Sequence, residues 1–135
     1  MPFYHAVVRP DVLAVGEREA LATDITDLRC EITGAPRTFV QVLFTVDDSG
    51  RLPSGVDCSY RANIRSGRTP QQTDELTTRL RDATVARTTA APSAVVIQIQ
   101  ETEASFVMEG GRLLPEPGSP EEEAWKAQDQ QVGAA

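Results

Sequence analysis

The sequence predicts an α+β domain in which two tandem β-α-β repeats form a four-stranded sheet with both helices on one face. Thr-Gly-Ala-Pro at residues 33–36 is echoed by Thr-Ala-Ala-Pro at residues 89–92, and an apolar, strand-like run follows each motif. The same spacing of 56 residues aligns residues 4–9 with residues 60–65, which share a tyrosine, an alanine and an arginine. Because these motifs and strand-like runs follow in the same order in both halves, the chain contains an internal duplication.

The first repeat covers about residues 2–46 and begins with a strand at residues 3–9. A helix is expected between residues 15 and 32, where aliphatic side chains recur with the spacing of one helix face: Leu21, Ile25, Leu28 and Ile32. Gly34 follows as a natural C-terminal stop. Residues 39–44 predict a second strand that is apolar on both faces and therefore buried.

The second repeat, about residues 58–118, opens with a strand at residues 59–65. A helix should begin directly afterwards, because Thr69 suits the N-cap, Pro70 suits the first helical position and Gln72 completes a capping box. This helix continues with apolar side chains at helical spacing: Leu76, Leu80 and Ala83. Alternating aliphatic residues then predict the last main strand: Val95, Ile97 and Ile99.

The remaining segments complete one domain over residues 1–135. A turn-rich linker at residues 47–57 joins the repeats, and an acidic tail at residues 119–135 is expected to be a short helix or a loose end. Two helices cover only one face of the sheet. Apolar residues on its other face and the extra segment 104–114 therefore favour a closed oligomer.

Composition excludes several classes of function. The formal net charge of −7 disfavours binding to nucleic acid or to acidic membranes. The chain contains no apolar run of membrane-spanning length and no secretory pattern at its start, so we expect a cytoplasmic protein without membrane contact. Cys30 and Cys58 lack metal-binding spacing and His5 is the single histidine, so we expect free thiols, no metal and no cofactor.

Pro2 is the first candidate for chemistry. A small residue after the initiator methionine allows methionine aminopeptidase to remove Met1, which would leave a free secondary amine on Pro2. Burial beside cations would lower the pKa of this amine and make it a usable general base. Proline at position two usually has no functional meaning, so this motif needs support from other residues.

Arg65 and Arg68 flank a turn between a strand and a capped helix. Two guanidinium groups at a helix N-terminus can bind a carboxylate, which indicates a small carboxylic acid as the ligand; two solvated surface arginines are the alternative. Glu109 precedes two glycines and could hold water or shuttle a proton, although a glutamate in a polar turn is more often simply exposed.

Together these features resemble the tautomerase superfamily, and within it the cis-3-chloroacrylic acid dehalogenase group, whose members fuse two repeats in one chain. The resemblance covers roughly residues 2–118. It rests on the N-terminal proline, on Ile-Thr-Asp at residues 25–27, on Arg-Ser-Gly-Arg at residues 65–68 and, most specifically, on Glu-Gly-Gly-Arg-Leu-Leu-Pro-Glu-Pro-Gly at residues 109–118.

The resemblance implies a fold like that of macrophage migration inhibitory factor and a homotrimer with its active site around the N-terminal proline. By analogy, Pro2 would exchange a proton with the substrate, Arg65 and Arg68 would bind the carboxylate, and Glu109 would help to activate water. The chain departs from the dehalogenase pattern at two substrate-binding positions. Arg29 replaces a histidine in the first helix, and Gln98 replaces a tyrosine on the last main strand.

Three functions follow from this pattern. The leading hypothesis is cofactor-independent tautomerisation of small 2-oxo or 2-hydroxy-enoate acids by Pro2, because this reaction needs no activated water; Arg29 as a third cation would suit a dicarboxylate. The second is dehalogenation of cis-3-haloacrylate or hydration of an acetylenic acid with the help of Glu109. The third is a non-catalytic binding protein, which would follow if Met1 is retained and the Pro2 nitrogen remains an amide.

Overall fold

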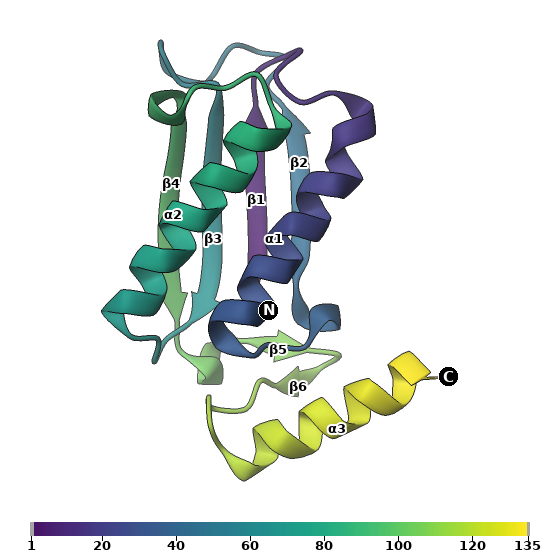
Figure 1. Ribbon diagram of the computed structural model, residues 1–135. Helices are drawn as coiled ribbons and strands as arrows, with labels where there is room; N and C mark the ends of the chain where they lie inside the picture. The colour runs from purple at the N-terminus through teal and green to yellow at the C-terminus, as the bar shows by residue number, and fades with distance from the viewer. Residues whose placement is uncertain (1, 135) are drawn as a thin grey trace.

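The structure of the protein is a computed structural model that describes residues 2–134, with side chains up to residue 128. Figure 1 shows two layers, a sheet and a pair of helices, with a hairpin and a third helix at one end of the sheet. The strands are β1 Phe3–Val8, β2 Gln41–Val46, β3 Cys58–Arg65, β4 Val95–Thr102, β5 Met108–Glu109 and β6 Arg112–Leu113, and the helices are α1 Arg18–Thr33, α2 Pro70–Arg87 and α3 Pro120–Ala134.

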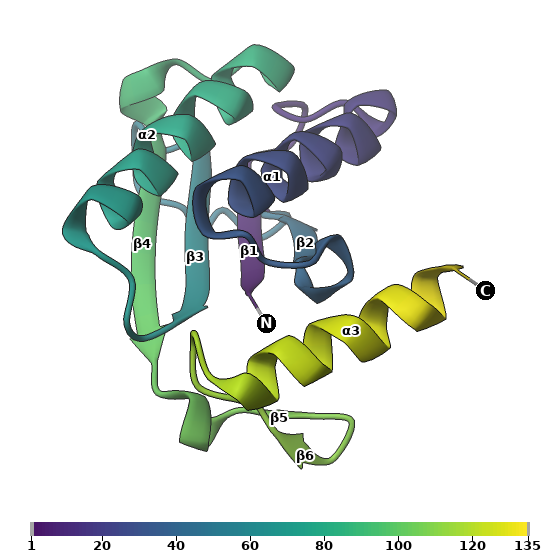
Figure 2. The same ribbon diagram turned by 60° about the horizontal axis from the view of Figure 1, so that its bottom comes forward.

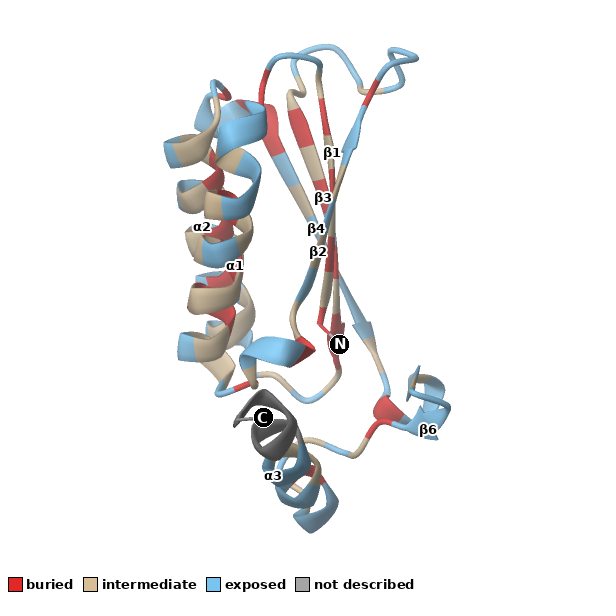
Figure 3. Ribbon diagram, turned by 90° about the vertical axis from the view of Figure 1, so that its right-hand side faces the viewer, coloured by how far each residue is buried: buried red, intermediate tan, exposed pale blue. Residues whose placement is uncertain are grey.

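The main sheet has the strand order β2-β1-β3-β4. Strand β1 pairs in parallel with β2, β3 pairs in parallel with β4, and the two repeats meet through the antiparallel pair β1 and β3. Each parallel pair requires a crossover, which α1 and α2 provide. The side view in Figure 3 places both helices on the same side of the sheet, so the predicted α+β architecture is confirmed.

The duplication in the sequence corresponds to duplicated packing. Tyr4 and Tyr60 are 0% and 1% exposed, and Ala6 and Ala62 are both fully buried. Even-numbered residues of both β1 and β3 face the helices, because side chains alternate along a strand. Against them pack the helix residues that the spacing predicted, including Leu21, Ile25, Leu28, Leu76 and Leu80.

Local signals define the ends of the two helices. In α2 the Thr69 Oγ1 atom accepts a hydrogen bond from the Gln72 backbone N–H at 3.1 Å, and the Gln72 side chain accepts one from the Thr69 N–H at 3.0 Å. Pro70 occupies the first turn, so the predicted capping box is confirmed. Helix α1 ends at Gly34, whose φ of 71° lies in the left-handed region that glycine adopts without strain.

The predicted burial of the second strand was wrong. The strand begins at Gln41, and Phe39 lies before it in a buried 3₁₀ turn. Leu43 is 47% exposed and Val46 is 37% exposed. Strand β2 is an edge strand of the sheet, and the helices cover only one of its faces. Leu43, which pairs with His5 and faces away from the helices, is therefore open to solvent in the single chain, whereas Val46 is exposed at the end of this edge strand.

The C-terminal segment returns to the start of β1. Residues 104–114 form a 3₁₀ turn and the β5–β6 hairpin, and the acidic tail forms α3. Arg112 of the hairpin stacks on the Trp125 ring of α3 at 4.9 Å from the ring centroid, which links these two elements. Figure 2 shows α3 running across the end of the molecule that carries the N-terminus. No helix among the described residues has an apolar stretch long enough to cross a membrane.

Candidate active site

Pro2 is buried at the start of β1. Its carbonyl oxygen accepts a hydrogen bond from the Gln41 backbone N–H at 3.0 Å, which holds this end of the chain against β2. Pro2 and Tyr4 lie on the same face of the strand because they are two residues apart. Figure 2 shows the start of β1 between α1 and α3.

Three arginines gather at this end of the sheet. Arg29 of α1 is 1% exposed, Arg65 at the end of β3 is 4% exposed, and Arg68 before α2 is half-buried. Burial lowers the pKa of Arg29, and the charge of Arg65 lowers it further. Burial also lowers the pKa of Arg68, as do the charges of Arg29 and Arg65. The three guanidinium groups are therefore close enough to repel one another and form a cationic cluster.

The polar atoms of this cluster lack partners. Among the described residues, the buried side-chain atoms without a hydrogen-bond partner are Tyr4 Oη, Arg29 Nε, Arg68 Nε and Glu122 Oε2. All four belong to this one region of the molecule, because Tyr4 lies beside Arg29 and Arg68, and Glu122 lies beside Arg65. Glu122 Oε2 is an acceptor and forms an ion pair with Arg65, whereas the other three atoms are donors. Buried polar groups in proteins are usually hydrogen-bonded, so three donors without acceptors at one place indicate a site for an anionic ligand.

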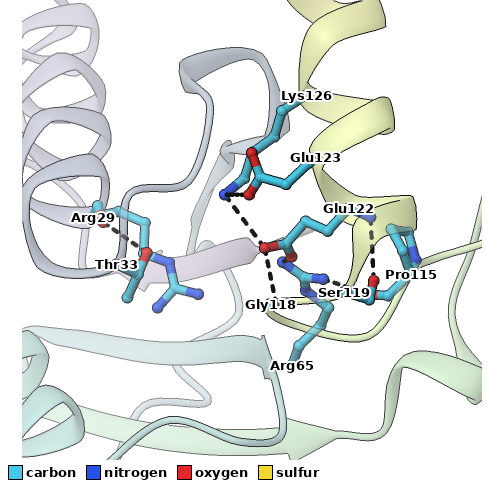
Figure 4. Close-up of polar contacts among 9 residues, drawn as sticks. All are labelled: Arg29, Thr33, Arg65, Pro115, Gly118, Ser119, Glu122, Glu123 and Lys126. Atoms are coloured by element: carbon cyan, nitrogen blue, oxygen red, sulfur yellow. Dashed lines mark hydrogen bonds and ion pairs between the residues drawn. The ribbon is translucent and has the colours of Figure 1, made fainter.

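Glu122 of α3 is the acidic partner of Arg65. Its Oε2 atom lies 2.5 Å from Arg65 Nη2, and Arg65 Nη1 donates a hydrogen bond to the Pro115 carbonyl oxygen at 2.6 Å. Figure 4 shows Arg65 between these groups, with Arg29 extending from α1 on the other side. Burial alone would raise the pKa of Glu122, but the Gly118 N–H, Arg65 and Lys126 outweigh it and hold the pKa below its ordinary value. The C-terminal segment therefore fixes the position of Arg65.

The Glu122–Arg65 pair leads to a prediction about stability. Replacing Glu122 by glutamine should lower the free energy of unfolding at pH 7 by about 2 kcal/mol, because a buried hydrogen-bonded charge pair is lost. The folded-state pKa of Glu122 is depressed, so its contribution is present above the ordinary carboxyl pKa and is lost as the pH falls through the folded-state value. The difference between wild type and variant should therefore shrink below about pH 4.

Urea denaturation at pH 7 and at acidic pH measures this effect. Glu123→Gln is the matched control, because the Glu123 side chain lies on the same helical turn but is 73% exposed. Equal free energies of unfolding for the two variants at pH 7 would contradict the assignment.

Glu109 lies in the hairpin next to the strand end that carries Pro2. It borders a surface hollow of about 420 Å³ together with Phe3, Gln41 and Met108. Phe3 follows Pro2 in the chain, and the Gln41 N–H binds the Pro2 carbonyl oxygen. The structure therefore brings Glu109 to the neighbourhood of Pro2, on the side of the sheet end that faces this hollow.

Gln98 is not brought to this site within one chain. It is exposed on β4, pairs with Arg61 of β3, and faces away from the helices. Strand β3 lies between β4 and β1 in the sheet. A side chain on this open face could reach an active site only in another subunit.

The sequence did not single out Tyr4 or Glu122. Glu122 lies in an acidic run that is typical of an exposed first helical turn, and nothing in that run marks it as buried. For Tyr4 a signal was present, since the duplication aligns it with Tyr60. No group of three or more histidine, cysteine, aspartate or glutamate side chains that could hold a metal ion occurs in the part of the chain that the structure describes.

Comparison with known proteins places this arrangement in a family. Residues 1–130 match the family model described as "Putative oxalocrotonate tautomerase enzyme". The structure of N1, a member of the cis-3-chloroacrylic acid dehalogenase family, is 31% identical, covers 99% of this chain and 100% of its own, and superimposes with a TM-score of 0.84. No match was found among the curated proteins.

Two more distant structures share the fold. A fused 4-OT described as a symmetric trimer is 15% identical, with 84% of this chain and 95% of its own covered and a TM-score of 0.75. Pt0534, solved after inactivation by 2-oxo-3-pentynoate, is 19% identical, with 83% and 96% covered and a TM-score of 0.74. The match over residues 1–130 and the likeness to N1 confirm the resemblance seen in the sequence, and the chain belongs to the tautomerase superfamily.

Proposed function

We propose that this member of the tautomerase superfamily is a cofactor-independent tautomerase of small 2-oxo or 2-hydroxy-enoate carboxylic acids. The observation that carries the proposal is the buried cationic cluster beside Pro2, in which guanidinium N–H groups remain without acceptors. A carboxylate supplies such acceptors, and arginine binds it in a fixed geometry. The nearby amine supplies the base that a proton shift requires.

The reaction begins after Met1 has been removed. The free Pro2 nitrogen accepts the proton of the substrate 2-hydroxyl group while the C2–O bond becomes a carbonyl. The protonated Pro2 then delivers this proton to the carbon that receives the electron pair of the enol double bond, which restores the free amine. Neighbouring cations disfavour the protonated amine, which keeps Pro2 available as a base near neutral pH. Proton loss from oxygen and proton gain at carbon balance, so no redox partner is needed.

The arginines bind the carboxylate end of the substrate. Glu122 pairs directly with Arg65, whereas the Nε groups of Arg29 and Arg68 have no acceptor among the described residues. The charge of Arg65 lowers the pKa of Arg29, and the charges of Arg29 and Arg65 lower the pKa of Arg68, so the three guanidinium groups lie together at one binding site. This arrangement suits a carboxylate together with the adjacent C2 oxygen, on which negative charge develops during proton transfer.

Self-association is part of the proposal. Apolar side chains remain exposed on the sheet face that the helices leave uncovered, including Leu43 and Val96. A fused 4-OT with the same fold is described as a symmetric trimer. We expect a homotrimer in which the open faces of the three sheets meet and Gln98 approaches a neighbouring subunit. Light scattering should give three times the chain mass of 14.6 kDa.

A second candidate is dehalogenation of cis-3-haloacrylates or hydration of acetylenic acids. The similarity to a member of the cis-3-chloroacrylic acid dehalogenase family supports it, as does Glu109 at the hollow next to Phe3. Gln98 at the position of the expected tyrosine speaks against efficient activation of water. Tautomerisation does not need that tyrosine, so it remains the first proposal.

Absorbance measurements distinguish these functions. Ketonisation of 2-hydroxymuconate or phenylenolpyruvate should be accelerated by the purified protein, whereas halide release from cis-3-chloroacrylate should be slow or absent. The reverse pattern would support the dehalogenase function. If neither substrate class reacts although Met1 has been removed, the protein is a binding protein on the same fold.

A further inference from the structure

Tyr4 and Tyr60 occupy equivalent places in the two repeats. Both lie on the helix-facing side of a central strand, both are buried, and they are 56 residues apart. The apolar positions of α1 and α2 correspond at an offset of 55 residues, which places Arg29 where the second repeat has Thr84. Each repeat therefore contains a buried tyrosine opposite one helix residue, and the two pairs can be compared directly.

In the second repeat, the tyrosine hydroxyl has a hydrogen-bond acceptor within the chain. Tyr60 Oη lies 2.9 Å from Thr84 Oγ1, and Thr84 Oγ1 donates to the Leu80 carbonyl oxygen at 2.7 Å. A hydroxyl group has one proton, and that of Thr84 is committed to Leu80, so Tyr60 is the donor between the two hydroxyls. The Tyr60 proton thus has an acceptor inside the fold.

In the first repeat, the tyrosine hydroxyl lacks such an acceptor. No described residue accepts the proton of the Tyr4 hydroxyl. Its charged neighbours are Arg29, which is close enough to donate to Tyr4 Oη, and Arg68. A guanidinium group has no acceptor, so neither arginine can take the Tyr4 proton. Tyr4 lies on the helix-facing side of β1, whereas the expected contact between subunits is on the open sheet face. No described residue of the chain supplies an acceptor, and a molecule that binds in the arginine cluster can supply one.

We propose that Tyr4 is a further substrate-contacting residue, whose hydroxyl donates a hydrogen bond to an oxygen of the bound 2-oxo acid beside Arg29. This inference rests on the proposed function for the identity of the ligand. Leaving a buried donor unpaired is unfavourable, and an oxygen of the acid removes that cost while it binds the arginines. Tyr4 is thus a specificity determinant for acids that place an oxygen next to the carboxylate.

The ionisation of Tyr4 agrees with a role as donor. Burial raises the pKa of Tyr4 to about 12, although the charges of Arg29 and Arg68 act in the opposite direction. The phenol therefore keeps its proton between pH 6 and pH 9. Any contribution of the hydroxyl to binding should be independent of pH over this range, unlike a contribution from the Pro2 amine.

The test compares Tyr4→Phe with Tyr60→Phe, since each variant removes one hydroxyl oxygen from an equivalent position. The ligand is oxamate, a 2-oxo acid analogue that cannot enolise, and calorimetry measures its affinity. Tyr4→Phe should weaken oxamate binding about 10- to 100-fold, the effect of a lost hydrogen bond to a charged acceptor, by the same factor at pH 6 and pH 9. Tyr60→Phe should change the affinity less than twofold.

Thermal unfolding provides the second measurement. Tyr60→Phe should lower Tm by several degrees because it removes a buried hydrogen bond, whereas Tyr4→Phe should not lower it. Equal oxamate affinities for wild type and Tyr4→Phe would overturn the inference, as would a wild type that does not bind oxamate. Weaker binding by Tyr4→Phe in a protein without ketonisation activity would support the contact but reject the proposed function. Ketonisation that is unaffected by Tyr4→Phe would do the opposite.

Discussion

A chain that retains Met1 should ketonise its substrate 100- to 10,000-fold more slowly than the processed chain, because general acid–base catalysis contributes a factor of this size. Retention of Met1 converts the Pro2 nitrogen into an amide, which has neither a proton to exchange nor useful basicity. The side chains of the arginine cluster are unchanged by this modification. Initial rates of 2-hydroxymuconate ketonisation before and after treatment with methionine aminopeptidase measure the effect in one preparation.

The control for this experiment is binding. Oxamate affinity should survive in the Met1-retaining chain better than activity does, since the arginines and Tyr4 remain in place. Intact mass identifies the fraction of processed chain at each time point, and activity should rise in proportion to it. Equal rates for chains with and without Met1 would exclude Pro2 as the base.

Arg29→Gln should lower kcat/KM about 10- to 100-fold, the range for a lost hydrogen bond to a charged group in a buried site. Arg29 is 1% exposed, its Nε has no acceptor, and no carboxylate among the described residues forms an ion pair with it. Removing it deprives the carboxylate head of a donor, and most of the loss should appear in KM. Steady-state kinetics with phenylenolpyruvate and 2-hydroxymuconate measure the effect.

Arg79→Gln is the matched control for Arg29→Gln. Arg79 lies on α2, is partly exposed and forms ion pairs with Glu31 and Glu75, and it is not among the described residues with unpartnered buried polar atoms. It should leave kcat/KM unchanged. If both variants retain full activity, Arg29 is not part of the substrate site, and the cationic cluster has a structural role.

Differences between the two repeats explain why one chain is expected to have one substrate site and not two. At the position equivalent to Pro2 the second repeat has Cys58, a buried thiol whose pKa burial raises to about 12. At the position equivalent to Arg29 it has Thr84, which accepts the Tyr60 proton. In the second repeat, internal hydrogen bonds therefore satisfy the polar groups at this position. In the first repeat, the corresponding groups remain available to a ligand.

Most of the fold could be predicted because its signals are local. The capping box around Thr69, the stop at Gly34 and the helical spacing in α1 and α2 depend on neighbours in the chain, and the structure agrees with each. The burial of β2 was wrong because Leu43 and Val46 become exposed only through the edge position of the strand, which depends on strand order and on the uncovered face.

The residues of the candidate site could be predicted only in part from the sequence, for a similar reason. Arg65 and Arg68 could be predicted from a turn motif, and Arg29 from the family resemblance. The ion pair between Arg65 and Glu122 could not, because the two residues are 57 positions apart and Glu122 lies in an acidic run with no distinctive pattern. Gln98 lies on a face whose surroundings depend on subunit assembly. Contacts between distant segments and between subunits leave no periodic signal in one sequence.

The central claim is that a free Pro2 amine lies within reach of a carboxylic acid held by the arginine cluster. Intact-protein mass spectrometry after incubation with 2-oxo-3-pentynoate tests it most directly, since this electrophile is itself a 2-oxo acid and inactivates Pt0534. The half-exposed thiol of Cys30 is a competing target, so the experiment includes Cys30→Ser. The account predicts a starting mass without methionine and a single adduct that maps to Pro2, is suppressed by oxamate, and forms more slowly in Arg29→Gln. A retained methionine, or an unlabelled Pro2 in a chain that lacks Met1, would contradict it.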